Sequence, residues 1–295
     1  MVEYLCKCSS FTENKKGKDG FLKKALSFVL VFVLVASFSV MVIGASGNDV
    51  GVYINGSEFT GNVRVQDSTT FVGVRRFANT VDPSASVKYN YSTRTLTISS
   101  SKLYMTIKDG ANYFVANGRY LYTASPVFMK YGVMYAPIML LAKAFDAKIS
   151  WSNATSSFYV TSGSGGILSG DLYYREDEVY WLSKIINAES GGEILRGKIA
   201  VGNVILNRVR SKYFPNTIYS VIFDRKNGVQ FSPVANGTIY KNANSESIIA
   251  AKICLEGYSI NNGIFYFVNP KISPSNWITK NRQFYAQIGN HAFYY

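Results

Sequence analysis

The sequence feature that most constrains the fold is an internal repeat. Residues 85–98, ASVKYNYSTRTLTI, align without gaps to residues 147–160, AKISWSNATSSFYV, at an offset of 62 positions. The preceding segments, FVGVRRFA from Phe71 and YAPIMLLA from Tyr135, align at an offset of 64, so the first copy has two extra residues near Asp82. Each copy is predicted to form an extended segment, a short helix and a β-hairpin. Because each copy is too small to bury its apolar face alone, we expect the two to pack into one scaffold or binding module.

The composition along the chain predicts an α+β protein with two domains. Residues 51–160 are rich in Val, Ile, Tyr and Thr, with Asn-Gly pairs in VYINGSEF and YFVANGRYLY that predict tight hairpin turns. The Gly- and Ser-rich segment at residues 161–170, TSGSGGILSG, predicts a flexible linker. Helical periodicity dominates residues 171–295, so a mainly α domain is expected after the β-rich module.

The N-terminal residues have the layout of a secretory signal peptide. Residues 1–24 carry six Lys against three acidic residues, a net charge of +3. Residues 25–43 contain no charged side chain, and the small residues of GASG follow. This order predicts a signal peptide over residues 1–45, with cleavage near Ala45. The 19-residue apolar run is also long enough to span a bilayer, so an uncleaved membrane anchor stays open. Both alternatives place the remaining chain outside the cytoplasm, in the extracellular space, the cell wall or a spore envelope.

Charge and cysteine content narrow the classes of partner and cofactor. The net charge of +13 favours polyanions such as nucleic acid, anionic membranes or an anionic cell wall. Because no nucleic-acid-binding fingerprint is present, nucleic acid is not an expected partner, and the membrane is expected only through residues 25–43. Beyond the N-terminal segment the chain has one cysteine, Cys254, and one histidine, His291. These two residues cannot form a disulfide or a typical zinc set, so no metal or cofactor is expected, and Cys254 is predicted to lie in a helix core.

The segment VYWLSKIINAESGG, residues 179–192, places a carboxylate at the end of an apolar helical stripe. Val179, Leu182, Ile185 and Ile186 recur at helical spacing, and Glu189 continues the series. The two glycines that follow predict a helix stop with positive φ. Desolvation and the negative end of the helix dipole are both expected to raise the pKa of Glu189, as glycosidic bond cleavage requires of its acid. The alternative, a helix-end glutamate that simply reaches solvent, is the commoner outcome of such a local pattern.

Four further patterns in residues 195–294 concern recognition. Asn203 and Asn207 share one helix face and are expected to bond a neighbouring loop more often than a ligand. The basic cluster of Arg208, Arg210 and Lys212 is predicted to be a solvated helix end. The loop around Gln230, Phe231 and Ser232 is expected to present amides and an aromatic ring to a sugar. Aromatic side chains near the C-terminus are expected to be mainly core, with a minority that stacks on sugar rings, at Tyr266, Trp277, Phe284, Tyr285, Phe293 and Tyr294.

Residues 51–160 resemble a known module of exported bacterial proteins. VMYAPIMLLAKAFDAKISW, from Val133 to Trp151, followed by SNATSSFYV, is similar to the copper amine oxidase N-terminal-like domain. The first copy departs from the second, with Gly73 where the second has Pro137, but it retains Arg75. Residues 51–160 contain no histidine, so copper ligands are not expected despite the name. The resemblance implies attachment or spacing, with contact to wall polymer as one such role.

Residues 178–295 resemble the bacterial cell wall hydrolase family that includes the spore cortex-lytic enzymes. The motifs IINAESGGEILRGKIAVGNVILNRV, FPNTIYSVIF, VQFSPVANGTI, AAKICLEG, YFVNP and IGNHAFY occur in the order of that family. The resemblance implies a lysozyme-like, mainly helical domain that cleaves the glycan strand of peptidoglycan. The family's catalytic glutamate falls on Glu189, and Ser190 departs from the residue that often follows it. The resemblance and the aromatic pattern together predict substrate-binding residues at Gln230, Phe231, Ser232, Tyr266, Asn269, Trp277 and His291. For His291, a packing role is the commoner alternative.

The choice of mechanism depends on the scarcity of carboxylates. Residues 171–295 contain nine acidic side chains, of which four precede the Glu189 helix and two, Glu246 and Glu256, are expected to be exposed at helix ends. Neither Glu193 nor Asp224 is an obvious partner for Glu189, and a lytic transglycosylase needs no second carboxylate. The sequence therefore predicts lytic transglycosylase action on the bond between N-acetylmuramic acid and N-acetylglucosamine. A muramidase that uses a second carboxylate and a non-catalytic wall-binding protein stay open, as does the choice between spore cortex and vegetative wall.

Overall fold

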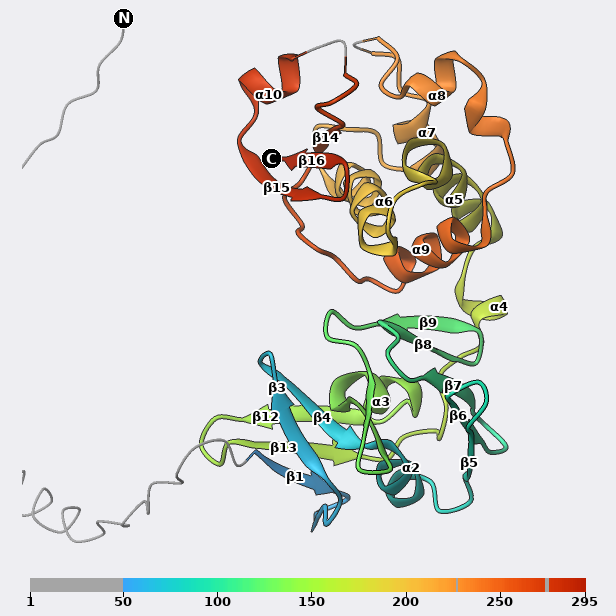
Figure 1. Ribbon diagram of the computed structural model, residues 1–295, viewed down its shortest axis with the longest axis vertical. Helices are drawn as coiled ribbons and strands as arrows, with labels where there is room; N and C mark the ends of the chain where they lie inside the picture. Colours follow the sequence, from blue (N-terminus) through green and yellow to red (C-terminus); the bar gives the residue numbers. More distant parts are fainter. Residues whose placement is uncertain (1–49, 227, 274–275) are drawn as a thin grey trace, which may run out of the picture. The chain divides into compact units, whose positions relative to one another are not determined.

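The computed structural model describes residues 50–226, 228–273 and 276–295 (Figure 1). The predicted signal peptide or anchor at residues 1–45, with its apolar run at 25–43, lies outside the described residues. No helix in the described ranges is long and apolar enough to cross a membrane. The described chain is α+β, with a β-rich repeat domain followed by a mainly helical domain.

The two sequence repeats form the same structural unit twice, as predicted. Each copy contains a hairpin, a short helix and a second hairpin, and the strands of the two copies correspond at the offsets of 64 and 62 residues. The elements of the first copy are β3 (Val63–Gln66), β4 (Thr69–Gly73), α2 (Val74–Val81), β5 (Ser86–Asn90) and β6 (Thr95–Ser99). Those of the second are β10 (Phe128–Lys130), β11 (Val133–Pro137), α3 (Ile138–Ala144), β12 (Lys148–Ser152) and β13 (Ser157–Thr161).

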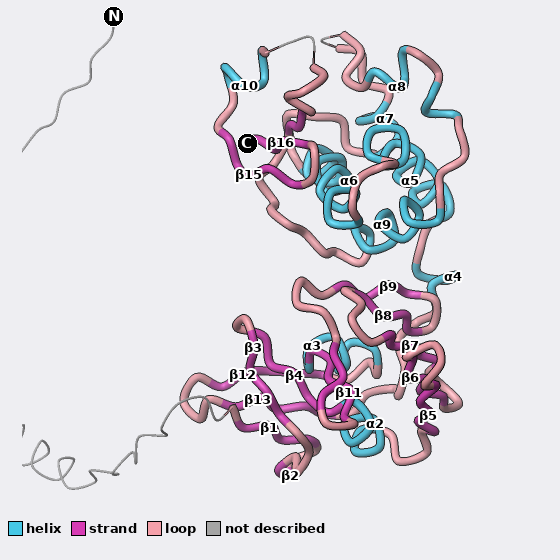
Figure 2. The backbone as a smooth tube through the Cα atoms, in the orientation of Figure 1, coloured by secondary structure: helices cyan, strands magenta, loops and turns pink. Residues whose placement is uncertain are grey.

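The two copies join through one antiparallel sheet and extend through two others (Figure 2). Strands β4 and β11 pair antiparallel, with Val72 opposite Ala136, so the sheet order is β10-β11-β4-β3. The remaining strands are β1 (Gly51–Ile54), β2 (Ser57–Glu58), β7 (Tyr104–Lys108), β8 (Tyr113–Ala116) and β9 (Arg119–Tyr122). They complete the sheets β12-β13-β1-β2 and β5-β6-β7-β8-β9. The shared core buries Phe77 of α2 against Phe145, which follows α3.

The predicted Asn-Gly turns are present at two hairpins. Asn55 and Gly56 have φ of 52° and 81° between β1 and β2, and Asn117 and Gly118 have φ of 49° and 77° between β8 and β9. Positive φ at both central residues is what a two-residue hairpin turn of this kind requires. These dipeptides therefore determine where the two hairpins turn.

The segment at residues 161–170 packs against the repeat domain, so the prediction of a flexible linker is wrong. Ile167 is buried, its N–H donates to the Ala144 carbonyl, and its carbonyl accepts from Asn117 Nδ2 at 2.8 Å. A Cβ on Gly163 would lie 1.8 Å from the Asp146 carbonyl oxygen. The glycine there permits close backbone approach, which composition alone does not distinguish from flexibility.

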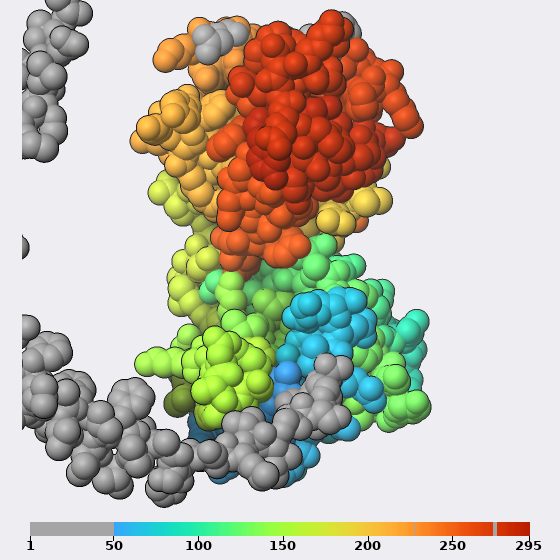
Figure 3. Space-filling model, turned by 90° about the vertical axis from the view of Figure 1, so that its left-hand side faces the viewer, coloured from blue at the N-terminus to red at the C-terminus, as the bar shows by residue number. Residues whose placement is uncertain are grey.

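The helical domain contains most of the remaining elements. Its helices are α4 (Gly170–Tyr173), α5 (Glu176–Ser190), α6 (Leu195–Arg210), α7 (Ile218–Ile222), α8 (Ser232–Ala235), the 3-10 turn η1 (Thr238–Tyr240), α9 (Ser245–Leu255) and α10 (Trp277–Asn281). A small sheet of order β14-β16-β15 is formed by β14 (Tyr266–Val268), β15 (Phe284–Ile288) and β16 (His291–Tyr294). The C-terminal residues, coloured red, make up much of the surface of this domain in Figure 3.

Helix α6 lies at the centre of the helical domain and is buried over most of its length. At Gly202, a Cβ would lie 2.7 Å from Cys254 Sγ of α9 and 2.9 Å from Ile186 Cδ1 of α5. Glycine therefore permits the close approach of the three helices, and Cys254 is a buried core residue as expected. Asn203 and Asn207 are also buried and donate to the carbonyls of residues 258, 261 and 264, so they fix a neighbouring loop.

The end of α5 differs from the prediction in its backbone. Gly191 caps the helix with φ of −56°, and neither it nor Gly192 is among the residues with positive φ. The expected left-handed stop is therefore wrong. A Cβ at Gly191 would lie 2.6 Å from the Asn187 carbonyl oxygen, so close approach explains this glycine.

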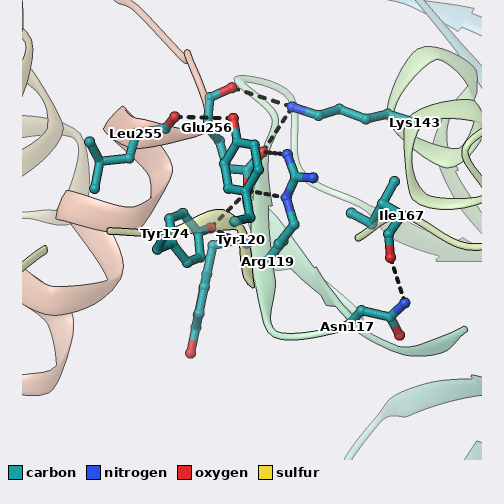
Figure 4. Close-up of polar contacts among 9 residues, drawn as sticks. Asn117, Arg119, Tyr120, Lys143, Ile167, Tyr174, Leu255 and Glu256 are labelled. Carbon is teal, nitrogen blue, oxygen red and sulfur yellow. Dashed lines mark hydrogen bonds and ion pairs between the residues drawn. The ribbon is translucent and has the colours of Figure 1, made fainter. Parts of the chain in front are cut away.

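A buried charge network joins the repeat domain to the C-terminal end of α9 (Figure 4). Glu256 accepts two hydrogen bonds from Arg119, from Nε to Oε1 and from Nη2 to Oε2, both at 2.7 Å. Lys143 Nζ donates to Oε2 at 2.9 Å, and the Tyr174 hydroxyl donates to Oε1 at 2.8 Å. The side chain of Glu256 is 3% exposed, so the expectation of an exposed helix-end carboxylate is wrong. Its cationic partners come from the other domain, which the local pattern around Glu256 does not reveal.

Candidate functional site

Glu189 lies in the last turn of α5, directly after the buried stripe of Leu182, Ile185 and Ile186. Its side chain is half-buried. In the part of the chain that the structure describes, no hydrogen bond or ion pair reaches its carboxylate. Burial raises the pKa of Glu189 to about 7, and the positive charge of Arg208 opposes that rise. The expected direction is confirmed, with desolvation as the main cause. A carboxyl with this pKa can both donate and accept a proton near neutral pH.

Arg208 of α6 is the electrostatic neighbour of Glu189. Its side chain is buried, with the guanidinium 5.0 Å from the Phe214 ring, 5.2 Å from the Phe231 ring and 5.5 Å from the Tyr266 ring. Nε donates to the Phe265 carbonyl at 2.9 Å, whereas Nη1 is buried without a hydrogen-bond partner among the described residues. Burial lowers the pKa of Arg208 to about 10, while Tyr266, Asp224 and Glu189 act in the opposite direction.

The prediction that Arg208 belongs to a solvated helix end is therefore wrong. Arg210 and Lys212 are exposed, as expected, but Arg208 follows the buried residues Val204 and Ile205 by four and three positions. This helical spacing is the signal in the sequence that places Arg208 on the buried face. The three basic residues lie close together along the chain, which by itself suggests one cluster.

The predicted recognition loop divides into a buried residue and two accessible ones. Phe231 is 3% exposed, and its ring lies 6.4 Å from that of Phe267, so the expectation that it faces a sugar is wrong. Ser232 begins α8 and is exposed. Gln230 is half-buried and donates from Nε2 to the Gly228 carbonyl at 3.2 Å. Phe231 thus anchors the loop under Arg208, and its two polar neighbours are the ones accessible to a ligand.

Tyr266 and Trp277 form an aromatic surface with Arg282. The guanidinium of Arg282 lies 4.5 Å from the Tyr266 ring and 5.0 Å from the Trp277 ring. The two rings are 6.5 Å apart, and Trp277 is 51% exposed. Because Tyr266 also faces Arg208, this surface connects to the surroundings of Glu189. Arg282 is a second residue that the sequence analysis missed. An accessible ring of this kind can stack on the apolar face of a sugar.

Asn269 and His291 have structural contacts that occupy them. Asn269 Oδ1 accepts from the N–H of Lys271 at 3.1 Å and so supports the turn after β14. His291 is buried, with its ring 5.5 Å from that of Phe267, and burial lowers its pKa. His291 therefore packs within the fold, while its Nδ1 is buried without a hydrogen-bond partner among the described residues.

Two other carboxylates were possible partners for Glu189. Glu193 accepts from the backbone N–H and from Nδ2 of Asn290, both at 2.9 Å. Burial raises its pKa, but these bonds outweigh burial and leave the pKa below the ordinary value. Asp224 accepts from the N–H of Lys226 at 2.9 Å and contributes, like Glu189, to the electrostatics of Arg208. Asp224 is therefore the carboxylate that shares a cation with Glu189, whereas Glu193 fixes the turn between β15 and β16.

Two segments of the chain match known protein families. Residues 53–160 match the Copper amine oxidase N-terminal domain family, and residues 192–294 match the Cell Wall Hydrolase family. This chain carries a cell wall hydrolase domain. The match begins at Gly192, three residues after Glu189, so the assignment of Glu189 depends on the geometry of α5 and on the resemblance noted above. No group of three His, Cys, Asp or Glu side chains in the described ranges is placed to hold a metal ion.

Individual relatives cover the cell wall hydrolase domain. The Spore cortex-lytic enzyme of Bacillus cereus is 35% identical over 120 residues, which are 41% of this chain and 45% of the relative. That of Oceanobacillus iheyensis is 32% identical over 120 residues, 41% of this chain and 42% of the relative. The solved catalytic domain of the germination-specific lytic transglycosylase SleB from Bacillus anthracis is 33% identical, and the match covers 44% of this chain and 100% of that chain with a TM-score of 0.38. The chain spans less than half the length of these curated relatives.

Proposed function

We propose that this protein cleaves peptidoglycan glycan strands between N-acetylmuramic acid and N-acetylglucosamine as a lytic transglycosylase. The observation that carries the proposal is the half-buried Glu189 carboxyl, whose pKa is raised to about 7 by burial. The printed names of the relatives, spore cortex-lytic enzyme and lytic transglycosylase, support the same substrate class. An acid that holds its proton near neutrality is the requirement of glycosidic cleavage.

In this mechanism Glu189 acts first as an acid and then as a base. Its proton passes to the glycosidic oxygen as the bond from the muramyl anomeric carbon to that oxygen breaks. The muramyl 6-hydroxyl oxygen then bonds to the anomeric carbon and its proton returns to Glu189, giving a 1,6-anhydro end. Between the two steps Glu189 is a carboxylate, which the nearby charge of Arg208 stabilises. Because no water enters, a second carboxylate is not required.

The accessible polar and aromatic residues around this centre are proposed to position the sugar. Trp277 and Tyr266 offer ring faces, and Gln230 and Ser232 offer polar groups near the buried anchor Phe231. Asn269 contributes indirectly, since its side chain shapes the turn that follows Tyr266. In this arrangement Phe231 and His291 serve the site by packing beneath it.

A muramidase is the second candidate, and Asp224 is the residue that favours it. Asp224 acts on the same guanidinium as Glu189, so both carboxylates lie near Arg208. In that reaction Asp224 would activate a water molecule or stabilise the cationic transition state. Glu193 is a weaker partner because Asn290 already binds both of its oxygens.

Mass analysis of the products from purified peptidoglycan tests the proposal. We expect anhydromuramic ends from the unmodified protein and no products from the Glu189→Gln variant. Reducing ends that disappear in an Asp224→Asn variant would establish the muramidase instead. The matched control is Glu193→Gln, which alters a neighbouring carboxylate and is expected to leave the products unchanged. Release of fragments at the normal rate by Glu189→Gln would contradict both mechanisms.

Two further proposals concern the cellular location of the protein and its natural polymer. We propose that residues 1–45 direct export and that the protein acts in the cell wall or spore envelope, where peptidoglycan lies. Parallel digests of spore cortex and of vegetative sacculi identify the preferred polymer, because cortex products carry muramic lactam. N-terminal sequencing of the exported protein distinguishes cleavage near Ala45 from a retained anchor.

A further inference from the structure

The repeat domain contains a cavity of about 690 Å³ that the proposed reaction does not use. It lies between helix α2, the β5–β6 hairpin and the β10–β11 hairpin. Its apolar floor includes Leu96 and Met134, which belong to the core of the domain. Its polar wall is formed by Arg75, Arg76, Asn79, Tyr89, Tyr91 and Arg94.

The cavity carries a net positive charge. Three arginines and one acid, Asp109, line it, so the formal charge is 3 − 1 = +2. Asp109 pairs with Arg94, whose Nη2 lies 2.5 Å from Oδ2, so the unbalanced charge belongs to Arg75 and Arg76. Arg75 donates through Nη1 to the Val87 carbonyl at 2.6 Å, and Arg76 donates through Nη2 to Thr60 Oγ1 at 2.9 Å. Each guanidinium has five N–H donors, so these bonds fix its position and leave further donors for an acidic group.

Of the two aromatic rings of the wall, that of Tyr91 is exposed and that of Tyr89 is half-buried. Tyr91 is 86% exposed, and its ring meets that of Tyr89 edge to face at 4.9 Å. A tyrosine held at the mouth of a cavity by another ring offers a flat apolar face and a hydroxyl at little further cost in entropy. Sugar rings, which have one apolar face and a polar edge, match this surface.

The second copy of the repeat shows that the fold does not require these residues. At the offset of 64, Met139 and Leu140 replace Arg75 and Arg76. At the offset of 62, Asn153 replaces Tyr91 and Ser156 replaces Arg94. Both copies nevertheless form the same hairpin, helix and hairpin. The three arginines and Tyr91 are therefore specific to the first copy, as a binding role would require, whereas Tyr89 corresponds to another aromatic residue, Trp151.

We propose that this cavity binds an acidic glycan, with a sugar ring against Tyr91 and its acidic group on Arg75 and Arg76. This inference rests on the proposed function, since peptidoglycan carries carboxylates on the peptide stems attached to its muramyl residues. Phosphodiesters of wall-linked polymers offer the same chemistry from a second source. Binding here would keep the hydrolase domain at a high effective concentration near its substrate.

Co-sedimentation of the full chain with purified sacculi tests the proposal. All proteins carry Glu189→Gln, so that the polymer is not consumed. We expect Arg76→Glu to weaken binding about tenfold, the loss of about one charge-assisted contact, and Tyr91→Ala to weaken it about threefold. The matched controls are Lys88→Glu, which makes the same charge change at an exposed site on β5, and Tyr104→Ala, at an exposed tyrosine on β7. We expect both controls to bind like the parent.

Two treatments of the sacculi identify the acidic group. Loss of binding after removal of phosphodiester polymers assigns the cavity to phosphate, and loss after amidation of carboxyl groups assigns it to the peptide stems. Equal binding by Arg76→Glu, Tyr91→Ala and the two controls would overturn the proposal, as would binding that survives both treatments. The proposed reaction is tested separately, by product release from short soluble glycans with Glu189 intact. A failure of product release would leave the binding result unchanged. A failure of binding would likewise leave the test of the reaction unchanged.

Discussion

The surroundings of Glu189 and of Glu256 show how one type of side chain serves two purposes. Both residues lie at the C-terminal ends of helices, Glu189 in α5 and Glu256 after α9, and both are withdrawn from solvent. The pKa of Glu189 rises to about 7 because burial dominates. For Glu256, burial also raises the pKa, but hydrogen bonds from Arg119, Lys143 and Tyr174 outweigh it and lower the pKa overall.

Hydrogen-bond donors, rather than burial alone, determine the protonation state of these two carboxyl groups. The Glu256 carboxylate accepts four hydrogen bonds from three side chains, which replace the lost hydration. The Glu189 carboxyl has no such donor among the described residues, and the charge of Arg208 acts on it only over a distance. One carboxylate is therefore kept ionised to hold two domains together, and the other is left able to exchange a proton.

The largest expected effect is on the rate of peptidoglycan cleavage, which should distinguish Glu189 from Glu256. Glu189→Gln is expected to lower the rate of peptidoglycan cleavage about a thousandfold, because the amide cannot donate or accept the proton. Glu256→Gln keeps the proposed acid, so its rate per folded molecule should stay near that of the parent. The measurement is fragment release at a temperature where both variants are folded. Equal losses of cleavage rate in the two variants would contradict a distinct catalytic role for Glu189.

The second effect concerns stability. Glu256→Gln is expected to lower the free energy of unfolding by about 3 kcal/mol, because it leaves the buried Arg119 without a counter-charge. Denaturant titration followed by tryptophan fluorescence measures this loss. Asp177→Asn is the control, since it breaks the exposed pair with Arg175 and should leave stability almost unchanged. A Glu256→Gln variant as stable as this control would show that the network contributes little.

The third effect is a stability change with pH that has opposite signs for the two carboxylates. The folded pKa of Glu189 is raised, so the native state binds more protons than the unfolded state between about pH 4.5 and 7, and stability falls as pH rises. Above pH 8, Glu189→Gln should be more stable than the parent by up to about 3 kcal/mol, and at pH 4.5 the gain should vanish. The folded pKa of Glu256 is lowered, so its contribution is present above the unfolded pKa and is lost as pH falls through the folded pKa. Thermal melts across this range test both signs; a gain for Glu189→Gln that persists at pH 4.5 would have another cause.

The smallest expected effect is a shift of the pH–rate profile. The charge of Arg208 lowers the pKa of Glu189, so Arg208→Met should move the alkaline limb of the profile to higher pH. Arg210→Met removes an exposed charge from the same helix and serves as the control. The profile of kcat/KM on soluble glycan measures the shift. A limb that moves to lower pH, or equally in both variants, would contradict a direct effect of Arg208 on Glu189.

Local sequence patterns determined much of the fold. The offsets of 62 and 64 residues placed both hairpin–helix–hairpin units, because each unit is made by short-range contacts and repeated turns. The Asn-Gly pairs located two hairpin turns, since few other residues adopt their backbone angles. The stripe that ends at Glu189 predicted its burial and the direction of its pKa, because helical periodicity relates sequence to buried face.

Which buried side chains contact one another depends on the tertiary structure. Arg208 and Phe231 became buried through contacts with each other and with Tyr266, residues far apart in the chain. Glu256 pairs with Arg119, which lies 137 residues away in the sequence. The Gly- and Ser-rich segment at residues 161–170 is held in place because its backbone packs on the repeat domain. Local periodicity indicates whether a side chain is buried. The donors and charges that it meets there come from distant segments, and these determine whether a buried carboxylate stabilises the fold or exchanges a proton.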